Sequence, residues 1–103
     1  MVPEDTRAGM LLACTYAQLG RKDEAVRGLE KVLTWDVTDP HTIYNGACTY
    51  GVLQMKEEAL ATLKRSVEAG YSEWALASRD PDLTCLHEDP EFKRLLESLK
   101  PKG

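Results

Sequence analysis

The stretch Ala13-Cys14-Thr15-Tyr16 returns as Ala47-Cys48-Thr49-Tyr50, 34 residues further along the chain. The same shift gives nine identities among the 34 pairs that residues 6–39 form with residues 40–73. A period of 34 residues is typical of solenoids in which each repeat is a pair of helices. The sequence therefore predicts two consecutive helix–turn–helix units.

The first copy has the apolar spacing of two helices. Leu12, Tyr16 and Leu19 recur at spacings of four and three, so they share one helix face. Gly20 marks the turn, because glycine tolerates the left-handed conformation that ends a helix. A second buried face follows, formed by Ala25, Leu29, Val32 and Leu33.

The second copy repeats this arrangement. Asp39-Pro40 opens it with an N-cap residue followed by a first-turn proline. Two apolar helix faces follow, one formed by Ile43, Ala47, Tyr50 and Leu53, the other by Ala59, Leu63 and Val67.

At the level of single residues the chain resembles the tetratricopeptide repeat (TPR) family, whose pattern places small, aromatic and large apolar residues at fixed positions. In the first copy the pattern falls on Gly9, Leu12, Ala13, Tyr16, Ala25, Leu29 and Val37, and in the second on Ile43, Gly46, Ala47, Tyr50, Ala59, Leu63 and Tyr71. The family's Trp and closing Pro are missing. The resemblance implies an all-α, right-handed solenoid of two repeats, and an unrelated four-helix bundle is the alternative.

The resemblance also implies a division of the chain. Residues 6–39 and 40–73 are expected to be the two repeats, and residues 74–103 a set of short capping helices. Pro3 lies one period before Val37, where the family carries its closing proline, so residues 1–5 look like the end of a preceding repeat. We expect the chain to be part of a longer protein, with a plain linker as the alternative for these residues.

The last third of the chain does not continue the repeat, because a further shift would put Pro81 inside a helix. Ser72 is the expected cap of one short helix, and Asp80-Pro81 and Asp89-Pro90 open two more. This tail is similar to the ends of many bacterial TPR signalling proteins. The residues expected to cover the fourth helix are Trp74, Leu83, Leu86, Phe92, Leu95 and Leu96. Docking of this segment elsewhere is the alternative.

Composition excludes several classes of function. The net charge of −4 argues against nucleic acid, which requires a basic surface. Apolar runs are only a few residues long, so no membrane span is expected. Three cysteines without paired spacing indicate a reducing cytoplasm rather than a disulfide scaffold.

No catalytic or metal-binding pattern stands out, so we expect no enzyme activity, no metal and no cofactor. His41 and Cys48 share a helix face, but cysteine is a common filler between helices. Helix caps and a solvated surface explain the carboxylates of Asp80, Asp82, Glu88 and Asp89.

The remaining function is recognition of a protein or peptide. The resemblance places the concave groove of the family on Arg7, Met10, Cys14, Ala17, Gln18, His41, Tyr44, Asn45, Cys48, Gly51 and Val52. This near-neutral wall predicts an apolar or weakly polar partner segment, with Met10 and Tyr44 as anchors. The alternative is a passive cap of a longer protein. An uncovered first helix further predicts homodimer formation.

Overall fold

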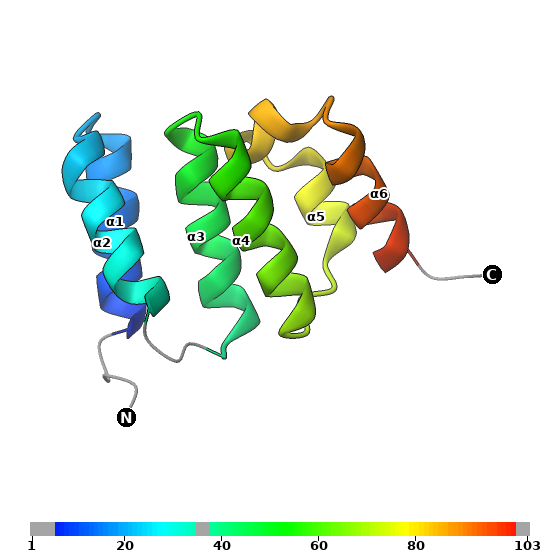
Figure 1. Cartoon of the computed structure of the whole chain (residues 1–103), viewed down its shortest axis with the longest axis horizontal. Coiled ribbons are helices and arrows are strands. Elements are labelled where there is room, and N and C mark those ends of the chain that lie inside the picture. Colours follow the sequence, from blue (N-terminus) through cyan, green and yellow to red (C-terminus); the bar gives the residue numbers. More distant parts are fainter. Residues whose placement is uncertain (1–5, 35–37, 101–103) are drawn as a thin grey trace.

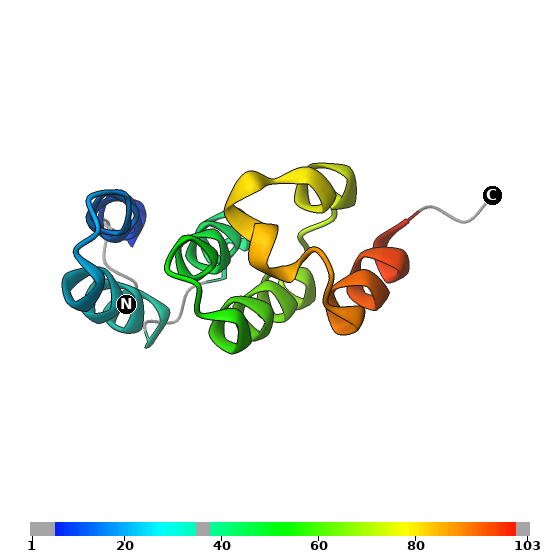
Figure 2. The same ribbon diagram turned by 90° about the horizontal axis from the view of Figure 1, so that it is seen from above.

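Six α-helices and one short 3₁₀ helix form two layers in a computed structural model, which describes residues 6–34 and 38–100 (Figure 1). The helices are α1 (Thr6–Gln18), α2 (Lys22–Thr34), α3 (Pro40–Val52), α4 (Lys56–Glu68), α5 (Trp74–Arg79), η1 (Pro81–Leu86) and α6 (Pro90–Leu99). Viewed from above, α1, α3 and α5 lie in one layer and α2, α4 and α6 in the other (Figure 2). The prediction of an all-α helical-repeat fold is confirmed.

Pro3, with the rest of residues 1–5, and Val37 lie outside the described residues, as does the side chain of Arg7. The predictions made for them therefore stay predictions.

Close approach of paired helices depends on small residues at equivalent positions of the two copies. Ala13, Ala25, Ala47 and Ala59 are all buried, and the larger Leu29 and Leu63 fill the space between the helices of each pair. Short side chains let two helix backbones come close, which a longer side chain at these positions would prevent.

The turns inside the two pairs have the same geometry and different residues. Gly20 adopts a φ of 77° after α1, and Arg21 N–H donates to the carbonyl of Tyr16 at 2.9 Å. Gln54 occupies the equivalent place after α3 with a φ of 63°, and Met55 N–H donates to the carbonyl of Tyr50 at 3.0 Å. Both turns satisfy a late helix carbonyl, but only the first uses the residue that adopts this conformation without strain.

The aspartate–proline signals are confirmed at all three sites. Asp39, Asp80 and Asp89 each accept a hydrogen bond from a backbone N–H two residues on, at 3.4, 3.0 and 2.8 Å. The prediction that Ser72 caps the short helix α5 is wrong. The N-cap residue of α5 is Glu73, and the Glu73 side chain makes no capping hydrogen bond.

The face formed by Leu12, Tyr16 and Leu19 is largely uncovered. Leu12 is 53% exposed and Leu19 is 66% exposed, whereas the buried side of α1 consists of Met10, Ala13 and Ala17. A face without a neighbouring helix pair is what the end of a solenoid leaves open.

The last third packs onto the second pair through a few apolar side chains. Leu83, Leu86, Phe92 and Leu96 are buried, and Trp74 and Leu95 are half-buried against the same core. The 3₁₀ helix η1 lies mainly against α3 and less closely against α4, while α6 packs against α5. Lys64 of α4 also forms an ion pair with Glu91 of α6 at 2.9 Å. The tail therefore contacts the inner helix α3 as well as the expected α4.

Candidate functional site

A cavity of about 290 Å³ lies where three parts of the chain meet: α1, α3 and the segment from Tyr71 to Asp82. Figure 2 shows α3 between α1 and α5 in the upper layer, so α3 supplies the floor and its neighbours supply the walls. We call this cavity, with its lining residues, the groove. The lining residues are Cys14, Ala17, Gln18, His41, Tyr44, Asn45, Cys48, Thr49, Val52, Tyr71, Glu73, Leu76, Asp80 and Asp82.

Most of the residues that sequence reasoning placed in the groove line this cavity, namely Cys14, Ala17, Gln18, His41, Tyr44, Asn45, Cys48 and Val52. Helical spacing explains their convergence, because residues three or four apart on α1 and α3 share a face. Cys14 also joins the two helices, since its thiol lies 2.8 Å from the hydroxyl of Thr49.

Met10 and Gly51 are corrections to the expected groove. Met10 is only 1% exposed and packs in the core, so it cannot be a surface anchor. Gly51 is covered by η1, because the backbone carbonyl of Asp82 occupies the space a side chain would need. Both errors have one cause: the sequence pattern did not show how closely neighbouring elements approach α3.

The expected near-neutral character of the groove is also wrong. Glu73, Asp80 and Asp82 bring three carboxylates into the cavity, and among the residues whose side chains the structure describes no lysine or arginine lines it. Asp80 and Asp82 lie outside the two copies of the repeat, where helix capping and a solvated surface explain them in the sequence, and Glu73 is the last residue of the second copy. One signal was available: Asp82 lies 34 residues after Cys48, as Cys48 does after Cys14, so the period itself points to this position.

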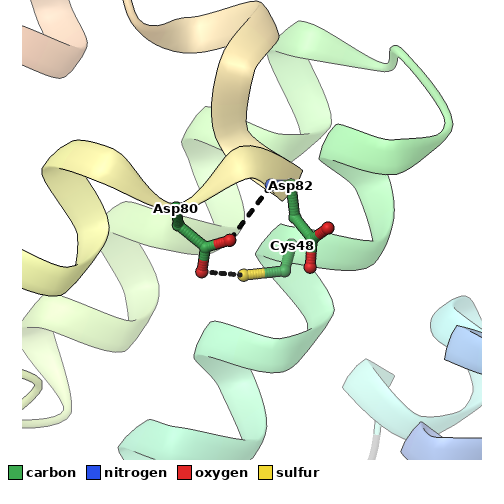
Figure 3. Close-up of side chains that lie close together, drawn as sticks. All are labelled: Cys48, Asp80 and Asp82. Atoms are coloured by element: carbon green, nitrogen blue, oxygen red, sulfur yellow. Dashed lines mark hydrogen bonds between the residues drawn. The ribbon is translucent and has the colours of Figure 1, made fainter.

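Asp80 is the centre of the hydrogen bonding in the groove. Its Oδ2 accepts from the Tyr44 hydroxyl at 2.7 Å and from the Cys48 thiol at 3.5 Å, and its Oδ1 accepts from Asp82 N–H at 3.0 Å. Figure 3 shows the last two of these bonds. The carboxylate therefore fixes the start of η1 against the middle of α3.

The Cys48 thiol and the Tyr44 hydroxyl are held in their protonated forms. Burial, and then the charge of Asp80, raises the pKa of the Cys48 thiol far above its usual range. Burial and the bond to Asp80 raise the pKa of Tyr44 in the same way. A reactive thiolate needs the opposite environment, with positive charge nearby. This arrangement suits binding and not nucleophilic chemistry.

Cys48, Asp80 and Asp82 are the one group of described residues whose donor atoms are close enough to share a metal ion, all lying within 4.8 Å of one another (Figure 3). Their chemistry fits a metal poorly. The thiol keeps its proton and donates a hydrogen bond to Asp80, and both oxygens of Asp80 already accept hydrogen bonds. A metal would have to displace a proton and break these bonds.

His41 does not approach Cys48 as a metal or catalytic pair. Its Nε2 lies 3.1 Å from the carboxylate of Glu73, and its ring packs edge-on against Tyr71 with a centroid distance of 5.6 Å. His41 therefore closes one end of the groove. All three cysteines are free thiols. In residues 6–34 and 38–100, no helix combines the length and apolar character that a membrane span requires.

Comparison with known proteins gives one match, to the family model of the tetratricopeptide repeat over residues 7–37. A search of curated proteins and a search of solved structures each give no match. Tetratricopeptide repeats are typically non-catalytic modules for protein–protein interaction. The matched residues span α1 and α2, and the same helix–turn–helix geometry returns in α3 and α4. Residues 7–37 are therefore a tetratricopeptide repeat, and the all-α fold of packed helix pairs is consistent with a TPR helical repeat.

Proposed function

We propose that this chain is a protein-interaction module and that its groove binds an extended segment of a partner protein. The observation that carries the proposal is the convergence of α1, α3 and the segment from Tyr71 to Asp82 on one cavity of about 290 Å³. Concave sites that collect side chains from several elements are where proteins bind small ligands and side chains of partners. The solenoid supplies a rigid frame for it, because each helix pair is held by its neighbour.

The lining supports binding of a peptide rather than of a second globular surface. Exposed polar groups on Gln18 and Asn45 lie beside buried walls formed by Ala17 and Tyr44. Amide side chains both donate and accept hydrogen bonds, which suits the backbone of an extended chain. A passive cap of a longer protein, our alternative, would need no such cavity.

Selection from a display library of random 12-residue peptides, made on the whole chain, tests this function. Asn45→Trp would fill the groove floor from an exposed position, and Ala61→Trp places the same bulk on an exposed position of α4 outside the groove. We expect the selected peptides to bind the parent and Ala61→Trp equally, and Asn45→Trp at least about tenfold more weakly. Circular dichroism confirms that each variant is folded.

Two results would overturn the proposal. One is a selection that yields no binding peptide, as a passive cap requires. The other is a set of peptides that bind the parent, Asn45→Trp and Ala61→Trp with the same affinity.

A further inference from the structure

The groove holds more negative charge than its own residues neutralise. Glu73 faces His41 at 3.1 Å, but no lysine or arginine with a described side chain lines the cavity. Asp80 uses both oxygens for bonds inside the protein. The Asp82 carboxylate accepts no hydrogen bond from the described part of the chain, although it lines the cavity beside Asp80.

The environment makes this unpaired charge costly. Burial, and then the neighbouring charge of Asp80, raises the pKa of Asp82 above its ordinary value. The folded chain thus holds a carboxylate where its ionised form is disfavoured. An arriving cation would remove that penalty, whereas an anion would increase it.

Tyr71 gives a second, independent sign of a missing ligand. Its side chain is only 2% exposed and lines the groove, and its hydroxyl has no hydrogen-bond partner among the described residues. The ring is fixed by stacking on Tyr44, with centroids 4.3 Å apart and planes 6° apart. A buried polar group without a partner is rare and costs free energy until something satisfies it.

The Tyr71 hydroxyl oxygen can accept a hydrogen bond from a bound ligand. Burial raises its pKa to about 12, so at neutral pH it is an uncharged hydroxyl whose oxygen can accept a hydrogen bond. Tyr44, its stacking partner, already donates its hydroxyl hydrogen bond to Asp80. The Asp82 carboxylate and the Tyr71 oxygen are therefore two acceptors of the groove that no described residue uses.

We propose that the groove receives a lysine or arginine side chain of the bound segment, with Asp82 supplying the opposite charge and Tyr71 an accepting oxygen. This inference rests on the proposed function for the rest of the segment. An organic cation brings N–H donors, and it uses acceptors that the fold leaves free. A metal ion at the same place would have to compete with the hydrogen bonds of Asp80.

Small cations test the chemistry without knowledge of the partner. The probes are the Nα-acetyl methylamides of arginine and lysine, added to the whole chain at up to about 20 mM, a range suited to weak fragment binding. The citrulline analogue has nearly the shape of arginine and no charge. Amide chemical shifts in the NMR spectrum report where each probe binds.

We expect both cationic probes to shift the amides of residues 44–48, Asp80 and Asp82, and the citrulline probe to bind at least about fivefold more weakly. Asp82→Asn and Tyr71→Phe should each weaken the binding of the cationic probes severalfold while the chain stays folded. Glu68→Gln removes one charge from an exposed position outside the groove and should change nothing.

Three results would overturn the inference: equal binding of citrulline and arginine, no shift with either cation, or binding that Asp82→Asn leaves unchanged. Zn²⁺ is a separate probe. If it perturbs these amides at micromolar concentration while the organic cations do not, the site is a metal site instead.

The experiments distinguish failure of the cation site from failure of the proposed peptide-binding function. Selected peptides that depend on the groove but show no enrichment in lysine or arginine would leave the peptide-binding function standing and remove the cation site. Cationic probes that bind while no peptide is selected would leave the cation site and remove the peptide-binding function.

Discussion

The Tyr44 hydroxyl donates a hydrogen bond to Asp80 at 2.7 Å and thereby joins α3 to the residue that caps η1. The two residues are 36 positions apart, slightly more than one period of the repeat. Local sequence does not suggest this contact, and it closes the groove on the side away from α1.

Tyr44→Phe should lower the free energy of unfolding by about 1.5–3 kcal/mol, because a hydrogen bond to a carboxylate is lost while the ring is kept. Urea denaturation measures the change. Tyr16→Phe is the control, since the Tyr16 hydroxyl makes no hydrogen bond within residues 6–34 and 38–100, and it should cost far less. Equal losses in the two variants would mean that the bond to Asp80 contributes nothing.

Gly51→Ala should destabilise the chain by about 1–3 kcal/mol, because the new methyl group overlaps the backbone carbonyl of Asp82 and pushes η1 away from α3. Gly28→Ala is the contrast. Its methyl group would make a tight but smaller contact with Ala13, at 3.3 Å from Cβ and 3.7 Å from Cα, and the substitution gains helix propensity of about 1 kcal/mol. A smaller loss for Gly51→Ala than for Gly28→Ala in thermal unfolding would contradict the close packing of η1.

Gln54→Gly should raise the free energy of unfolding by about 1 kcal/mol. Gln54 has a φ of 63°, where a side chain is strained and glycine is not. Gln54→Ala keeps the strain and should give no such gain. A stabilisation of the same size by both substitutions would show that loss of the glutamine side chain, and not backbone strain, is the cause.

Leu12→Glu with Leu19→Glu should prevent self-association of the chain. Both leucines are more than half exposed on α1, and a second copy is the expected occupant of this face. Analytical ultracentrifugation should show concentration-dependent association for the parent and a monomer for the variant. Ala61→Glu with Ala75→Glu adds the same charge at other exposed positions and should leave association unchanged. A monomeric parent at all concentrations would remove the homodimer prediction.

Asp82→Asn should raise the thermal midpoint at neutral pH and leave it nearly unchanged near pH 3. The pKa of Asp82 is raised by burial and then by Asp80 in the folded chain, so the stability that Asp82 contributes is fully present below its unfolded pKa of about 3.9. It is lost as the pH rises through the raised folded pKa. The gain should be well under 1 kcal/mol, because water screens this partly exposed group. An equal gain at both pH values would show that charge is not the cause.

Much of the fold follows from local patterns in the sequence. The 34-residue shift predicts the two helix pairs, and the aspartate–proline pairs predict where three of the later helices begin. These signals are local: a capping carboxylate bonds to a backbone amide two residues away, whatever the rest of the chain does.

The α1 and α3 sides of the groove could be predicted for the same reason. Cys14, Ala17, Tyr44 and Cys48 lie on helix faces that the period fixes. Exposure could not be predicted, because it depends on what a neighbouring element covers. Met10 has the right position on α1 and is buried, while Leu12 has the apolar character of a core residue and is exposed.

The sequence by itself determined the helices, their pairing and the small residues between them, since helical period and capping act over a few residues. Only the tertiary structure decided the charge of the groove. The irregular segment from Tyr71 to Asp82 folds back across α3 and brings Asp80, Asp82 and the unpartnered Tyr71 hydroxyl beside Tyr44 and Cys48. The path of this segment is set by Leu83 and Leu86, which pack in a core shared with α3 and α4. This packing joins distant parts of the chain, and no local pattern encodes it.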